Sequence, residues 1–137
     1  MSVINELIRT EENGTISFGN YMLAAKSKKE EFEHEGDLYK VKTFNEITKL
    51  ERNGMFVYES VPGTAVNSFE VKNNEVSFAV SGAQDAQITI QLEDDMEYEV
   101  FTDGIAVGGM KTNMSGKLSL SVELSEGKSV EVKVVRK

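Results

Sequence analysis

The stretch KLSLSVELSEGKSVEVKVV, residues 117–135, decides the fold class. Apolar side chains occupy every second position on both sides of its SEGK corner: Leu118, Leu120, Val122, Leu124, Val130, Val132 and Val134. A period of two places one face of a strand against a core and the other face in water, as in antiparallel sheets. The stretch therefore predicts two amphipathic strands joined by a turn at Glu126-Gly127.

The same alternation of apolar and polar residues continues through the rest of the second half of the chain. Further alternating stripes are Val76, Phe78 and Val80, then Ile88, Ile90 and Leu92, then Met96, Tyr98 and Val100. Turn-forming pairs separate them, and Asp103-Gly104 is a strong hairpin signal because both central residues of a type I′ turn need positive φ. Short strands at this spacing are typical of a β-sandwich. We expect six or seven strands here, similar in outline to an immunoglobulin or fibronectin domain.

The first half is less regular but is also rich in strand patterns. Residues 14–23 predict a strand with a bulge at Gly19, residues 37–43 predict a second strand, and residues 47–61 predict a hairpin that turns at Asn53-Gly54. The charged segment 26–36 is interpreted as a solvated loop or a short helix. Residues 1–9 are interpreted as a short amphipathic helix or as a strand lying on a neighbour.

The pair Pro62-Gly63 is the best internal boundary. It divides the chain into a smaller N-terminal β-rich subdomain, residues 1–66, and a C-terminal β-sandwich, residues 67–137. No linker composition surrounds the pair, so we interpret it as a turn between packed halves. The predicted fold is all-β and mainly antiparallel.

Composition excludes several classes of function. The 137 residues include no cysteine and one histidine, which excludes thiolate metal sites, cysteine nucleophiles and sites that need two imidazoles. The net charge of −8 disfavours nucleic-acid binding, because no basic run stands apart from glutamates. No apolar stretch approaches the ~18 residues that span a bilayer, and the N-terminus lacks a secretory signal pattern. We therefore expect no membrane partner and a cytoplasmic location.

Four features could carry chemistry, and each also has a structural interpretation. His34 lies in the acidic stretch EFEHEGD, where it is either a proton donor or a solvated side chain. Glu97 and Glu99 share a strand face at a separation of about 7 Å, which suits a glycosidase pair but also an ordinary wet face. The acidic turn residues Asp85, Asp94 and Asp95 resemble no known calcium loop. Gly108-Gly109 is interpreted as a bulge or a tight bend, since no phosphate-binding glycine spacing surrounds it.

These patterns predict no catalytic residue, no cofactor and no metal site. Two groups remain as candidate interaction residues. The first is the N-terminal apolar set Val3, Ile4, Leu7 and Ile8, which could dock onto a neighbouring subunit. The second is Tyr21 and Tyr58, whose rings could stack on a sugar, although core packing also explains them.

Three segments carry a family resemblance: NELIRTEENGTISFGNY (5–21), EGDLYKVKTFNEITKLERNGMFVYESVPGT (35–64) and YEVFTDGIAVGGMKTNMSGKLSLSVEL (98–124). They resemble a family of short bacterial proteins labelled endosialidase. The resemblance implies action on a sialic-acid polymer, but no aspartate-box motif or arginine triad is present onto which catalytic residues could be placed. Residues 96–135 are also similar to the C-terminal β-sandwich of some polysaccharide-active enzymes.

Two functions follow as expectations. The first is a non-catalytic structural or interaction protein that self-associates into a homo-oligomer, because residue types suited to catalysis are scarce and a small two-layer sheet leaves edges that need cover. The alternative is a carbohydrate-binding or glycan-processing accessory module, with a glycan as its partner.

Overall fold

A computed structural model describes residues 3–137. Within that range the chain forms thirteen strands and no helix. Their bounds are β1 Ile8–Thr10, β2 Ile16–Phe18, β3 Ser27–His34, β4 Asp37–Phe44, β5 Ile47–Arg52, β6 Met55–Val61, β7 Ala65–Lys72, β8 Glu75–Ser81, β9 Ala86–Gln91, β10 Glu97–Thr102, β11 Ile105–Lys111, β12 Lys117–Val122 and β13 Ser129–Arg136. The all-β prediction is confirmed, and the described part of the chain contains no helix that could span a membrane.

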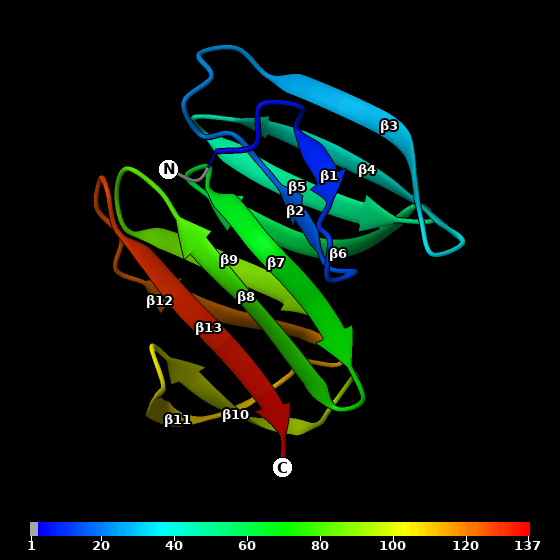
Figure 1. Cartoon of the computed structure of the whole chain (residues 1–137). Helices are drawn as coiled ribbons and strands as arrows, with labels where there is room; N and C mark the ends of the chain where they lie inside the picture. Colours follow the sequence, from blue (N-terminus) through cyan, green and yellow to red (C-terminus); the bar gives the residue numbers. More distant parts are fainter. Residues whose placement is uncertain (1–2) are drawn as a thin grey trace.

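The strands form two antiparallel sheets. The seven-stranded sheet has the order β1-β2-β7-β8-β13-β10-β11, and the six-stranded sheet has the order β12-β9-β6-β5-β4-β3. Figure 1 shows β7, β8 and β13 running side by side through the middle of the molecule, with the edge strands β3 and β11 at opposite ends. The immunoglobulin or fibronectin type stays a prediction.

The two predicted halves meet inside both sheets. Strand β2 pairs with β7 in one sheet, and β6 pairs with β9 in the other. The alternating side chains of both halves enter one hydrophobic core, at whose centre Tyr58 meets Phe18, Phe69 and Phe78 edge-on at 5.3–6.4 Å between ring centroids. The ranges 1–66 and 67–137 therefore share one core, because sheet pairing joins strands across their boundary.

The sequence patterns place most strands correctly. The second half contains seven strands, β7 to β13, as its alternation and turns predict. The hairpin β5–β6 turns at Asn53-Gly54, where both residues have positive φ, as a type I′ turn requires. Pro62 follows a cis peptide bond, and the Gly63 amide donates to the Asn45 carbonyl oxygen at 3.1 Å.

The prediction for the charged segment 26–36 is wrong. The segment forms the eight-residue strand β3, not a loop or a helix. Strand β3 is the edge of the six-stranded sheet, so most of its side chains stay in water and no apolar alternation marks it. Dense charge on an edge strand also blocks edge-to-edge pairing with other chains.

Candidate functional site

The N-terminal apolar set mostly faces the chain's own core. Ile4 and Ile8 are fully buried, and Leu7 packs against the core with a positive φ. Backbone bonds hold the segment in place, because the Ile4 amide donates to the Gly19 carbonyl and the Gly19 amide donates to the Leu7 carbonyl, both at 3.0 Å. Residues 3–7 are non-helical and lead into β1, while residues 1–2 of the predicted segment lie outside the described residues. Val3 and Leu7 are half-buried and keep part of their surface for a neighbour.

The two candidate stacking tyrosines are also buried. Tyr58 is fully enclosed, and its hydroxyl oxygen lies 2.8 Å from the Thr64 Oγ1. Burial raises the pKa of Tyr58 above its ordinary value, against the opposing effect of that hydrogen bond. Burial also raises the pKa of Tyr21, which is 8% exposed. Neither ring is open to a sugar, so the core-packing interpretation holds for both.

His34 lies at the end of β3, in contact with β1. Its Nδ1 is 3.0 Å from the Thr10 Oγ1, and its Nε2 is 3.8 Å from a Glu35 carboxylate oxygen. The order hydroxyl, imidazole, carboxylate resembles a nucleophile relay, but 3.8 Å exceeds the ~3.2 Å reach of a catalytic hydrogen bond. The geometry instead ties the edges of the two sheets together at this end of the molecule.

The acidic candidates have structural partners. The Glu99 carboxylate forms an ion pair with Lys137 at 3.6 Å, and Glu97 lies exposed on the same strand. Asp85 accepts a hydrogen bond at 3.0 Å from the amide of Leu124, 39 residues away, so its side chain joins two segments distant in the chain. Within residues 3–137 no cluster of three potential metal-ligating side chains occurs.

A cavity of about 290 Å³ opens between the sheets at the end where the hairpin tips of β3–β4 and β5–β6 meet. His34, Tyr39 and Arg52 line it, together with acidic side chains including Asp37. Burial raises the pKa of Tyr39, and the neighbouring Arg52 acts in the opposite direction. Asp37 accepts a hydrogen bond from the Asn53 side chain at 2.9 Å, so it already has a partner. The cavity holds ionisable groups but no activated nucleophile.

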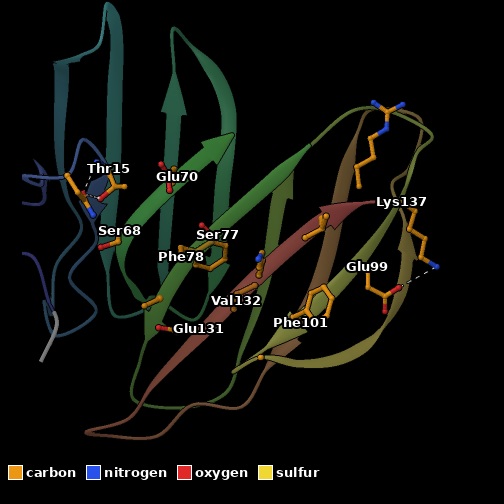
Figure 2. A pocket seen from close by; sticks show the side chains of 16 residues that line it. Thr15, Ser68, Glu70, Ser77, Phe78, Glu99, Phe101, Glu131, Val132 and Lys137 are labelled. Carbon is orange, nitrogen blue, oxygen red and sulfur yellow. Dashed lines mark hydrogen bonds and ion pairs between the residues drawn. The ribbon is translucent and has the colours of Figure 1, made fainter. Parts of the chain in front are cut away.

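A larger trough of about 790 Å³ crosses the outer face of the seven-stranded sheet. Figure 2 shows its lining side chains, with Ser77 and Phe101 among them and a dashed line joining Lys137 to Glu99. Its cations are neutralised, since Lys133 pairs with Glu75 at 3.5 Å and the other two cations also have acidic partners. A trough of hydroxyls, small side chains and paired charges suits a neutral polar ligand.

The edge strand β11 differs from the other three edges. Strand β1 has only three residues, β3 is densely charged, and the exposed side chains of β12 are polar. Strand β11 carries no charge before Lys111, and Ile105 and Val107 are 69% and 52% exposed. Short or charged edges resist pairing with other chains, whereas an apolar edge invites it.

The opposite sheet also leaves part of the inner face of β11 exposed. Ile105 is opposite Thr102 in the β10–β11 ladder, on the face where Val100 enters the core. The side chains of β10 on this face, Tyr98 and Val100, are buried, so the exposure of Ile105 marks an uncovered part of the core face. The ladder shifts register between Val100 and Phe101, and Gly108 has a φ of +128°, which confirms the bulge expected at the glycine pair.

The comparisons with protein families, with curated proteins and with solved structures give no match to this chain. The endosialidase resemblance stays a prediction.

Proposed function

We propose that this chain is a non-catalytic structural protein that self-associates through β11. The observation that carries the proposal is the exposure of Ile105 and Val107 on an uncharged edge strand. Exposed apolar groups on a sheet edge are typical of interaction surfaces. We propose a second copy as the partner, because β11 carries no charge before Lys111 and its apolar part therefore adds no local like-charge repulsion to a contact between copies.

A two-fold arrangement of two copies would cover the exposed face of β11 in both. In such a contact each copy presents the same patch, so β11 of one copy covers β11 of the other. Burying one isoleucine side chain contributes about 1.5–3 kcal/mol, and a two-fold contact buries it twice. Removing both contributions, at least about 3 kcal/mol, should weaken the dimer about 100-fold or more.

Sedimentation velocity tests this proposal with Ile105→Lys. The wild-type protein should sediment as a dimer at micromolar concentration, and Ile105→Lys should sediment as a monomer. The matched control is Val71→Lys, which places a lysine at a valine 57% exposed beside another hairpin turn, in β7. A monomeric wild type, or a control that dissociates equally, would contradict the proposal.

Carbohydrate binding is the second candidate function, and the trough on the seven-stranded sheet is the observation that favours it. With Tyr21 and Tyr58 buried, Phe101 is the aromatic side chain that lines this trough. A glycan array that includes polysialic acid, followed by a hydrolysis assay, tests the candidate. Binding that Phe101→Ala weakens at least tenfold would support it, and no binding or release would remove it.

A further inference from the structure

Three lysines from three different strands form one row on the outer face of the six-stranded sheet. Lys28 of β3 is directly opposite Lys42 of β4, and Lys42 is directly opposite Lys49 of β5. Side chains of directly opposite residues share a face, with Cβ atoms about 4.5–5.5 Å apart. The sequence conceals this row because seven to fourteen positions separate its members.

The lysine row lowers the stability of the folded protein when no partner is bound. Like charges at directly opposite positions of a sheet are destabilising. Lys28 is relieved by Glu30 at 3.1 Å and Lys49 by Glu51 at 3.6 Å. Lys42, in the middle, has no ion pair with any described residue. A costly arrangement that persists in a structure points to a role outside folding.

The lysine row changes the electrostatic environment of the neighbouring Glu30 carboxylate. The pKa of Glu30 is lowered mainly by its hydrogen bond and charge contact with Lys28, and Lys40 and Lys42 lower it further. Lys40 projects from the same face of β4 as Lys42, two residues away. A carboxylate is therefore favoured at this place in a chain whose net charge is −8.

We propose that the lysine row, Lys28, Lys42 and Lys49, binds an extended acidic segment of another protein. Charge complementarity selects an anionic partner, since Lys42 has no ion pair with a described residue and shares the charge of Glu30 with Lys28 and Lys40. The lysines stop at Lys49. The next residue across the sheet is Glu59, and Thr89 and Ser119 follow it on the neighbouring strands.

The short length of the row favours a peptide over a nucleic acid. A phosphate backbone carries a charge at every nucleotide, so phosphates beyond the three lysines would meet Glu59 and the acidic remainder of the surface. A peptide places carboxylates only where its side chains require them. Its backbone amides can donate hydrogen bonds to Glu59 and to the hydroxyls of Thr89 and Ser119.

Fluorescence anisotropy at low salt tests the proposal with a labelled peptide of three glutamates followed by uncharged serines and glycines, so that its carboxylates match the three lysines and its uncharged part passes Glu59. Wild type should bind the peptide, and Lys42→Glu should bind it at least tenfold more weakly. The matched control is Lys133→Glu, which makes the same charge change at a lysine of the opposite sheet. Equal weakening by both variants, or no binding by wild type, would overturn the proposal. So would a single-stranded DNA oligomer of equal charge that binds as tightly as the peptide.

Thermal stability gives a second readout that does not depend on the β11 contact. Lys42→Gln should raise Tm at low salt, because it removes like-charge repulsion. It should also abolish the rise in Tm that the three-glutamate peptide causes in wild type. Lys133→Gln, which removes an ion pair with Glu75, should not raise Tm and should keep the response to the peptide. A Lys42→Gln variant with lowered Tm would show that the lysine is structural and would contradict the inference.

Discussion

A core role and a ligand-binding role for Tyr58 give opposite predictions for the free energy of unfolding when this residue is replaced. Its ring is fully buried and meets Phe18, Phe69 and Phe78 edge-on, which joins aromatic side chains from both halves of the chain. Tyr58→Ala should cost about 3–5 kcal/mol for the lost packing and cavity. Loss of the hydroxyl contact with Thr64 adds about 1 kcal/mol. The sum is a large part of the 5–15 kcal/mol by which domains are usually stable.

Tyr58→Phe separates the two contributions. It keeps the ring and removes the hydroxyl, while the Thr64 Oγ1 retains its contact with the Ser60 Oγ at 2.8 Å. The expected cost is therefore only about 0.5–1.5 kcal/mol. Met55→Ala is the control, because Met55 lies on the same strand and is 72% exposed, so its cost should stay within about 0.5 kcal/mol.

Urea denaturation measures these free energies of unfolding. Circular dichroism and tyrosine fluorescence should give coincident transitions, because both halves share one core. A Tyr58→Ala cost below about 1 kcal/mol would refute the core role of Tyr58. Two separate transitions would refute the shared core.

Three further predictions concern pH and glycine packing. Burial raises the pKa of Tyr58, so the unfolded chain loses this proton first and the free energy of unfolding should fall above about pH 10 by up to 1.4 kcal/mol per pH unit. Tyr58→Phe should reduce that fall in urea titrations on both sides of this pH. The Ser17 hydroxyl bond lowers the pKa of Glu11, so its stabilising effect is present above pH 4.5 and lost as pH falls. Glu11→Gln should therefore flatten the acid side of the stability profile by about 1 kcal/mol, and an unchanged profile would count against the bond. Gly63→Ala would place a Cβ 2.0 Å from the Phe44 carbonyl oxygen and should cost more than about 3 kcal/mol by thermal melting. Gly82→Ala would place a Cβ 3.2 Å from the end of the Leu124 side chain and 3.6 Å from the next atoms, and should cost less than about 1 kcal/mol.

Strands with one buried face were predictable from the sequence. The alternation around Leu118 and Val132 shows which face is buried, and the pair Asn53-Gly54 fixes a turn by its backbone requirements. Strand β3 was not predictable in this way, because an edge strand with both faces near water has no hydrophobic period. The pairing of β2 with β7 and of β6 with β9 depends on contacts far apart in the chain, which local patterns do not specify.

The candidate sites were less predictable than the fold. Large side chains such as those of Ile4 and Tyr58 suit both interfaces and cores, and only burial separates the two roles. The lysine row depends on cross-strand register, which sequence spacing does not reveal. The uncovered edge at Ile105 had one local signal, the uncharged run from Gly104 to Met110 beside a hairpin turn.

Amide hydrogen exchange across a dilution series tests self-association through β11 most directly. Amides of β11 that face away from β10 have no partner within the chain as described, so only a second copy can protect them. The account predicts that exchange in residues 105–111 slows as protein concentration rises, while exchange in the charged edge strand β3 stays unchanged. Exchange in β11 that is independent of concentration would contradict the account.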